Sequence, residues 1–259
     1  MLNYAVNISM IGDPRPLAER IRLVADAGFR AVEFWFPHQF DMAEMKRLTR
    51  EHDLEVALFD LEPSDSHPYG HHADPDAEDE FFKRLDDAFR LAPELGCRTI
   101  NVLQGQDISE VGFERQLAVS VDRLARAAQL AEREGILLCV EAINTIDRPG
   151  SFCHNTAIGT RIVREVGSDS LRFQYDAYHM QLMEGNLVNT IRANVDAIGH
   201  VQFADPPGRN EPGTGEVNFD AIVRTLEELS YQRWVSLEYW ASDPAVDPFA
   251  WLPRSARGR

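Results

Sequence analysis

Four residues with oxygen-donor side chains lie at or near the ends of four successive apolar stretches of the chain: Glu141, Asp176, Gln202 and Glu238. Three carboxylates brought together without a cation repel one another and raise one another's pKa values. A divalent ion removes that conflict, and oxygen donors suit Mg²⁺ or Mn²⁺ better than zinc. Taken singly, each acid is better explained by a pair with a nearby arginine or lysine. Taken together at four consecutive strand ends, they predict a metal site.

The elements that must position these residues alternate along the chain. Eight short apolar stretches predict strands at residues 4–8, 31–35, 55–60, 99–103, 137–141, 171–176, 200–205 and 234–239. Amphipathic stretches predict helices at residues 16–28, 41–51, 76–95, 112–134, 155–166, 186–196 and 218–229. Strand–helix alternation over 259 residues predicts an α/β fold that closes into a (β/α)8 TIM barrel. We expect one domain over residues 1–259, with an irregular Pro-rich tail from about residue 241 in place of the last helix.

The alternation of side chains within the last four predicted strands indicates a polar barrel interior. Side chains of a strand point to opposite faces in turn, so one set faces the helices and the other faces the barrel axis. The inward set is mostly polar and consists of Cys139, Glu141, Gln174, Asp176, His200, Gln202, Ser236 and Glu238. Barrel active sites lie at the carboxyl ends of the strands. The four oxygen donors are therefore expected at that face.

Composition limits the classes of partner. The formal net charge is −16, so phosphate backbones and anionic lipids would repel the chain. We expect a small-molecule substrate, with no nucleic acid and no membrane as partner. Three cysteines without a CxxC spacing, no signal-peptide pattern and no apolar run near 20 residues indicate a cytoplasmic protein.

Six stretches, in order and over nearly the whole chain, resemble the hydroxypyruvate isomerase family of the xylose isomerase-like TIM barrels. They are NISM (7–10), AGFRAVEFWFP (27–37), LLCVEAIN (137–144), QYDAYHMQLMEGNL (174–187), GHVQFAD (199–205) and GRNEPGTGEVNF (208–219). The resemblance implies that Glu141, Asp176, Gln202 and Glu238 hold Mg²⁺ or Mn²⁺, and that Glu141 and Glu238 also form the acid/base pair. Related ketose 3-epimerases usually have histidine at the position of Gln202, which favours hydroxypyruvate isomerase. Related enzymes often associate, so a homo-oligomer is a possible state.

The resemblance also implies a reaction, the interconversion of hydroxypyruvate and 2-hydroxy-3-oxopropanoate through an enediolate. One glutamate removes a carbon-bound proton, the metal stabilises the negative charge, and an acid returns a proton to the neighbouring carbon. Residues 60–65, DLEPSD, depart from the family pattern on the active-site face. A 2-oxotetronate isomerase or a ketose 3-epimerase with the same mechanism is therefore an alternative. A DNA-repair barrel, which needs several histidine ligands and a basic groove, and a non-catalytic barrel are remote alternatives.

Three further side chains are candidate substrate contacts. His179, three residues after Asp176, is expected to donate to a substrate oxygen or to orient Asp176. Arg209 is expected to bind a substrate carboxylate, unless it is solvated or pairs with Glu211. Glu33 is expected to touch substrate or to pair with a lysine or arginine in the barrel.

Two loop features complete the expectations. Trp35 and Phe36 are candidates for an apolar wall of the pocket, or for residues that only pack under a loop. The segment SDSHPYGHHADPD (64–76) holds three histidines but has no metal-ligand spacing on a rigid element, so we expect a flexible surface loop.

Overall fold

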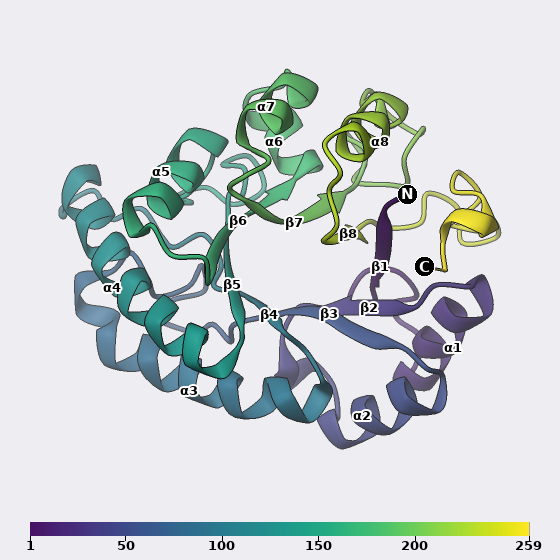
Figure 1. The fold of residues 1–259 in the computed structure, drawn as a ribbon, viewed down its shortest axis with the longest axis horizontal. Helices are drawn as coiled ribbons and strands as arrows, with labels where there is room; N and C mark the ends of the chain where they lie inside the picture. Colours follow the sequence, from purple (N-terminus) through teal and green to yellow (C-terminus); the bar gives the residue numbers. More distant parts are fainter. Residues whose placement is uncertain (259) are drawn as a thin grey trace.

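All eight predicted strands form, and they pair in chain order to close a parallel barrel (Figure 1). The computed structural model describes residues 1–258. The strands are β1 (Asn3–Asn7), β2 (Ala31–Phe34), β3 (Glu55–Asp60), β4 (Thr99–Asn101), β5 (Leu137–Glu141), β6 (Leu171–Asp176), β7 (Ile198–Phe203) and β8 (Trp234–Leu237). Pairing of β1 with β8, from Asn3 opposite Trp234 to Val6 opposite Leu237, closes the ring. The predicted (β/α)8 barrel is confirmed.

The helices surround the barrel on its outside (Figure 1). They are α1 (Leu17–Ala27), α2 (Met42–Glu51), α3 (Glu78–Leu95), α4 (Phe113–Glu134), α5 (Thr156–Val166), α6 (Ala177–Met183), α7 (Leu187–Asn194) and α8 (Phe219–Glu228), with short 3-10 turns η1 (Pro37–Gln39), η2 (Pro75–Ala77) and η3 (Arg254–Ala256). The seven predicted helices are present. None of the helices in residues 1–258 combines the length and the apolar composition that crossing a bilayer needs.

Helix α6 is the element that the sequence patterns did not predict. It has only seven residues and begins directly after Asp176, the last residue of β6. The Asp176 carboxylate accepts a hydrogen bond from the backbone N–H of Tyr178 at 2.8 Å and so caps this helix. The residue that was expected to hold a metal therefore also starts a helix.

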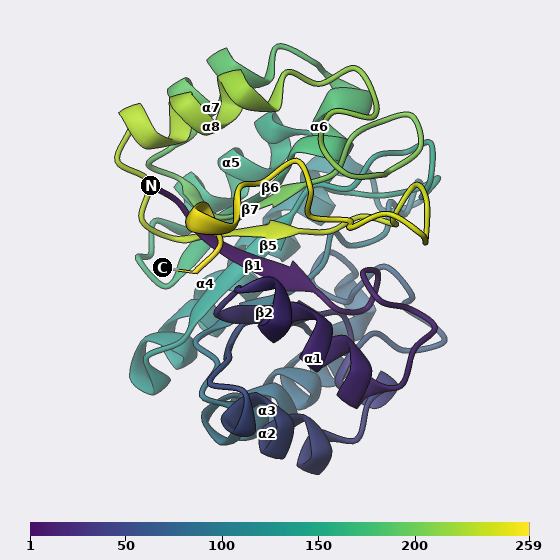
Figure 2. The same cartoon turned by 90° about the vertical axis from the view of Figure 1, so that its right-hand side faces the viewer.

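The C-terminal tail lies between α8 and α1 in both views (Figures 1 and 2). Its only helical piece in the described residues is η3. The Phe249 ring packs 4.8 Å from the Phe29 ring, centre to centre, and buried Arg257 donates hydrogen bonds to the carbonyls of Phe249, Leu252 and Ala27. The tail thus covers the outside of the barrel between α8 and α1, where a helix following β8 would lie. Residue 259, the end of the predicted tail, lies outside the described residues.

The predicted alternation sorts the strand residues between two layers. The outward residues of β5 to β8, such as Val140, Phe173 and Val201, join the large apolar core beneath the helices. Inside the barrel, a small cluster of Ala5, Ala31 and Ala57 packs near its amino end. Above this cluster the interior is polar, as the sequence predicts.

The histidine-rich segment 64–76 is not the flexible surface loop that we expected from its sequence. His71 and His72 are buried, and Nδ1 of His72 lies 2.8 Å from the Ser120 hydroxyl on α4. Buried Arg123, also on α4, donates to the carbonyls of His71 and Asp74 at 2.6 and 2.7 Å. These contacts fix the loop after β3 against α4, because they satisfy backbone groups that the loop would otherwise leave unpaired.

Candidate active site

A cavity of about 110 Å³ opens among the loops that follow the strands. Its polar wall includes Asp60, Glu141, Asp147, Arg148, His179, Arg209 and Glu238, and its apolar wall includes Trp35, Phe36, Pro68, Tyr69 and Leu103. The expectation that Trp35 and Phe36 form part of a pocket wall is confirmed. Asp176, Gln202 and Glu33 are not among the lining residues.

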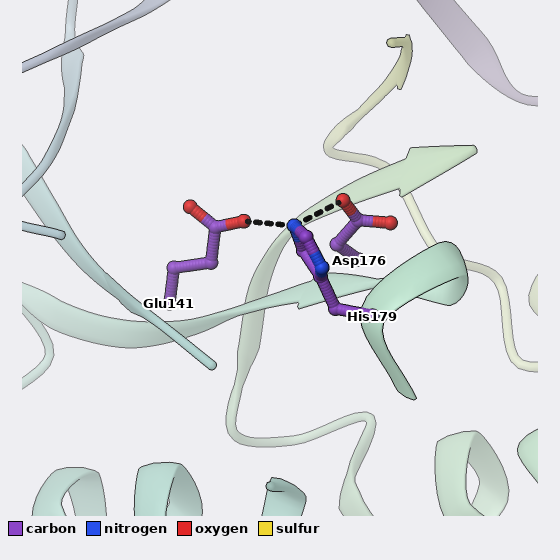
Figure 3. Close-up of side chains that lie close together, drawn as sticks. All are labelled: Glu141, Asp176 and His179. Carbon is purple, nitrogen blue, oxygen red and sulfur yellow. Dashed lines mark ion pairs between the residues drawn. The ribbon is translucent and has the colours of Figure 1, made fainter. Parts of the chain in front are cut away.

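Glu141, Asp176 and His179 form a compact buried group, as Figure 3 shows. One potential ligand atom from each of the three lies within 4.8 Å of those of the other two. Nε2 of His179 is 3.4 Å from Asp176 Oδ2 and 3.9 Å from Glu141 Oε1. Of the groups of three or more acidic, histidine or cysteine side chains in residues 1–258, this is the one that could hold a metal ion.

The side chain of Asn144 determines which nitrogen of His179 carries a proton. Asn144 Oδ1 accepts hydrogen bonds from the backbone N–H groups of Ile146 and Asp147 at 3.0 and 2.7 Å. Its Nδ2 is thereby directed at His179 Nδ1, at 2.6 Å, and donates to it. Neutral His179 then carries its proton on Nε2, the nitrogen that faces the two carboxylates. His179 is therefore arranged as a hydrogen-bond donor.

Burial and mutual repulsion perturb the acids of the site. Burial raises the pKa of Glu141 well above its ordinary value, and neighbouring Glu238, Asp176 and Asp60 raise it further. Burial also raises the pKa of Asp176, to about 8, although Arg209 opposes the shift. Burial lowers the pKa of His179 well below its ordinary value, and the charges of Arg209 and Arg148 add to this effect. The group is therefore short of positive charge around its carboxylates.

The chemistry of the group fits a divalent cation. Asp176 Oδ2 is buried and accepts no hydrogen bond from any described residue. A buried carboxylate oxygen without a partner is costly unless a cation or a donor satisfies it. Carboxylate oxygens are the ligands that Mg²⁺ and Mn²⁺ prefer.

Arg209 links Glu238, at the end of β8, to the group. Its Nη2 lies 2.6 Å from Glu238 Oε2 and 3.6 Å from Asp176 Oδ2. The other oxygen of Glu238 accepts from Trp35 Nε1 at 2.6 Å and from Asn7 Nδ2 at 3.0 Å. The alternative that Arg209 pairs with Glu211 is wrong, because Glu211 instead accepts from the backbone N–H of Ser242 at 3.0 Å.

Gln202 and Glu33 lie in a hydrogen-bonded layer inside the barrel. Gln202 Oε1 accepts from Gln174 at 2.9 Å, and Gln202 Nε2 donates to Glu33 Oε1 at 2.7 Å. Glu33 also accepts from Asn7 at 3.0 Å and lies 2.6 Å from His200 Nε2. Its neighbour from the basic residue types is thus a histidine, instead of the lysine or arginine that the sequence suggested. The structure places neither residue on the cavity wall.

Three positioning residues were missed at the sequence level. Asn101 donates to Asp60 at 3.1 Å and to Glu141 at 2.8 Å, and Asn7 links Glu33 with Glu238. Both asparagines end strands, so the same alternation applied to β1 and β4 would have found them. Asp205 gave no such signal, because its role depends on the loop after β7.

The buried carboxylate of Asp205 organises the loop that presents Arg209. It accepts hydrogen bonds from the backbone N–H groups of Gly213, Gly215 and Val217 at 2.9, 2.9 and 3.0 Å. The backbone of Asp205 also pairs with that of Asn210, next to Arg209. Arg209 itself has φ 53°, in the left-handed region of backbone conformations. A residue other than glycine adopts this conformation when the surrounding structure holds it there.

Comparisons with known proteins agree with this fold. A family model described as "xylose isomerase-like TIM barrel" matches residues 21–257. Hydroxypyruvate isomerase of Escherichia coli K12 is 39% identical over 254 residues, which cover 97% of this chain and 98% of that protein. The 2-oxo-tetronate isomerase of Cupriavidus necator is 34% identical with the same coverage of both chains. A crystal structure described as AP endonuclease, family 2, from Brucella melitensis superposes with a TM-score of 0.92 at 33% identity, over 97% of this chain and 98% of that one.

Proposed function

The chain belongs to the hydroxypyruvate isomerase family of the xylose isomerase-like TIM barrels, and we propose that it is a metal-dependent isomerase of small hydroxy-keto acids. The preferred reaction is the interconversion of hydroxypyruvate and 2-hydroxy-3-oxopropanoate. The observation that carries this proposal is that two glutamates, Glu141 and Glu238, line the same cavity. They come from the ends of β5 and β8, so they can approach a small substrate from different sides.

The perturbed acidity of the two glutamates suits proton transfer at carbon. A catalytic base works best when its pKa lies near the working pH, and burial raises the pKa of both Glu141 and Glu238. In the proposed reaction, one glutamate takes the proton from the hydroxymethyl carbon of hydroxypyruvate, giving an enediolate. The other glutamate, which starts protonated, delivers a proton to the former carbonyl carbon. The hydroxyl proton passes from the oxygen of the first carbon to the former carbonyl oxygen. The net change moves one carbon-bound hydrogen, one hydroxyl proton and one carbonyl between adjacent carbons.

Glu141, Asp176 and Glu238 would hold a divalent ion, Mg²⁺ or Mn²⁺, together with Gln202 if its Oε1 leaves Gln174. When bound, such an ion supplies Lewis-acid stabilisation of negative charge on adjacent substrate oxygens. His179 is assigned a different task, since its Nε2–H is a donor: it hydrogen-bonds a substrate oxygen or orients Asp176. Arg209 neutralises Glu238 and Asp176 through Nη2, and it also lines the cavity.

The size of the cavity favours a substrate of few carbons. Pockets for drug-sized ligands measure roughly 300–1,000 Å³, whereas this cavity measures about 110 Å³. Hydroxypyruvate and 2-oxotetronate both suit it, and a relative at 34% identity bears the name 2-oxo-tetronate isomerase. A six-carbon ketose, the substrate class of a ketose 3-epimerase, is the less suitable alternative.

A second candidate function is DNA repair, because the Brucella melitensis structure is described as an AP endonuclease. That chemistry would need several histidine ligands and a basic face for the phosphate backbone. The candidate metal group contains one histidine, and the net charge of −16 opposes DNA binding. We therefore retain the isomerase as the proposal.

One panel assay tests the proposal. Purified protein with Mn²⁺ or Mg²⁺ is incubated with hydroxypyruvate, 2-oxotetronate, a ketohexose and a DNA duplex that contains an abasic site. We expect turnover of hydroxypyruvate at the highest kcat/KM, and its loss in the variants Glu141→Gln and Glu238→Gln. Cleavage of the duplex without isomerisation of any keto acid would overturn the proposal, as would full activity of both variants.

A further inference from the structure

The cavity wall presents an electrostatic difficulty for an anionic substrate. Four acids line it, namely Asp60, Glu141, Asp147 and Glu238, and the whole chain carries a net charge of −16. A substrate carboxylate entering this cavity is repelled unless a cation faces it. The proposed divalent ion would be shared with Glu141, Asp176 and Glu238, so a basic side chain on the cavity wall is the further source of positive charge for a substrate carboxylate.

Three basic side chains line the cavity, and two of them are already engaged. Nδ1 of His179 accepts from Asn144, and its Nε2 faces Asp176 at 3.4 Å and Glu141 at 3.9 Å, so both ring nitrogens are engaged. Arg209 lies 2.6 Å from Glu238 and 3.6 Å from Asp176, so its charge offsets two buried carboxylates. Withdrawing it from them would leave buried charges unpaired.

Arg148 is the third basic side chain, and its guanidinium is free. It forms no ion pair and donates no side-chain hydrogen bond to any residue in 1–258. It lies over the ring of Tyr69, with Cζ 6.0 Å from the ring centre, and both residues line the cavity. Its acidic neighbour Asp147 is occupied elsewhere, accepting from the Tyr178 hydroxyl at 2.9 Å and from Asn144 at 3.0 Å.

The loop that carries Arg148 is held firmly in place. The Arg148 N–H donates to the Asn144 carbonyl at 3.2 Å, and the Arg148 carbonyl accepts from Ser151 N at 3.2 Å. Phe152 N donates to the Gly105 carbonyl at 3.0 Å, which joins this loop to the one after β4. The stem of the Arg148 side chain therefore starts from a fixed point, which reduces the entropy lost when its head orders on a ligand.

We propose that Arg148 binds the carboxylate of a small keto-acid substrate, and that Arg209 serves as the counter-ion of Glu238 and Asp176. This inference rests on the proposed function for its substrate class. It moves the carboxylate contact from Arg209, where the sequence placed it, to the mouth of the cavity. The planar guanidinium can donate two parallel hydrogen bonds to a carboxylate, which selects acids over neutral hydroxyketones.

Isothermal titration calorimetry with two unreactive ligands tests the inference. Pyruvate carries a carboxylate, and pyruvamide replaces that carboxylate with a neutral amide on the same ketone. The proteins, each with Mn²⁺ present, are the wild type, Arg148→Gln, Arg148→Lys, Arg209→Gln and Arg133→Gln. The last removes an equal charge from the exposed last turn of α4 and serves as the control.

We expect Arg148→Gln to weaken pyruvate binding at least tenfold and to leave pyruvamide binding within twofold. Arg148→Lys retains the charge without the planar fork, so it should weaken pyruvate less. Arg133→Gln should change neither ligand. A wild type without preference for pyruvate, an equal effect of Arg148→Gln on both ligands, or a selective loss of pyruvate in Arg209→Gln but not in Arg148→Gln would overturn the inference.

The outcome is separable from that of the proposed function. Suppose that the wild type isomerises none of the keto acids in the panel, but that Arg148→Gln binds pyruvate more weakly than the wild type does. The proposed reaction is then wrong, and the proposed carboxylate contact of Arg148 is supported. If the wild type isomerises hydroxypyruvate and Arg148→Gln leaves the KM for hydroxypyruvate unchanged, the proposed reaction is supported and the proposed carboxylate contact of Arg148 is wrong.

Discussion

Arg209 Nη2 lies 2.6 Å from Glu238 Oε2, so the loop after β7 places a cation on the last strand of the barrel. The same nitrogen is 3.6 Å from Asp176, and both acids are proposed metal ligands. Arg209 thus supplies part of the positive charge that a bound divalent ion would also supply. Arg209 and a bound divalent ion would therefore both be attracted to the carboxylates of Glu238 and Asp176, and each would reduce the stabilisation that the other provides.

Replacing Arg209 with glutamine should destabilise the metal-free protein more than the metal-loaded protein. Loss of one partner from a buried ion pair costs about 3 kcal/mol, whereas a divalent ion neutralises the same acids. The rise in melting temperature on adding Mn²⁺ should therefore be larger in Arg209→Gln than in wild type. Thermal unfolding with and without Mn²⁺ measures this. An equal drop in both states would mean that Arg209 and the metal do not share these carboxylates.

Removing divalent ions should abolish the isomerase activity. Without an ion, the negative charge of the enediolate would develop beside Glu141, Asp176 and Glu238 with no cation of comparable strength. Dialysis against EDTA is expected to give inactive protein, and Mn²⁺ or Mg²⁺ should restore activity. Elemental analysis of each sample provides the control. Activity that persists in protein shown to be metal-free contradicts the mechanism.

Asp205→Ala should lower activity although Asp205 does not line the cavity. The substitution removes three backbone hydrogen bonds from a charged acceptor, at about 2–4 kcal/mol in stability, and releases the loop that fixes Arg209. We expect kcat/KM to fall on the order of a hundredfold, with faster amide hydrogen exchange in residues 206–218. Glu216→Gln, an exposed change in the same loop, is the matched control. Normal exchange in Asp205→Ala would exclude this positioning role.

The buried imidazole of His72 should make the stability of the fold sensitive to mild acid. Burial lowers its pKa from 6.5 to about 3, so the unfolded chain binds a proton here that the folded protein does not. This contribution to stability is complete above pH 6.5 and is lost as the pH falls toward 3.

For this site alone the loss is about 2 kcal/mol between pH 7 and pH 5. His72→Asn should remove that part of the pH dependence while the stability at pH 7 falls. Urea unfolding at several pH values measures both. If the two proteins lose equal stability between pH 7 and pH 5, His72 is not the residue that titrates.

Strand–helix alternation was enough to predict the barrel, and side-chain alternation was enough to predict that Glu141 and Asp176 meet at the carboxyl ends of its strands. Glu141 and Asp176 end strands whose inward and outward residues are clearly distinguished, so their convergence follows from the strand period. The site roles of the individual residues remain predictions. The histidine-rich loop was misread because its burial depends on Arg123, which lies 52 residues beyond His71 in the chain. The partner of Arg209 was missed for a related reason, since it depends on a loop conformation imposed by Asp205.

The junction of β6 with α6 has a consequence for how such a protein can diversify. Asp176 ends the strand and caps the helix, and His179 lies within the first turn. No intervening loop exists in which residues could be added or lost without displacing both side chains. The segments after β3 and β5, which carry Tyr69 and Arg148, are longer, so a change in one of them does not displace Asp176 or His179. We expect sequence changes and altered ligand preference to accumulate in these two segments, while the junction of β6 with α6 keeps the reactive end of the cavity unchanged.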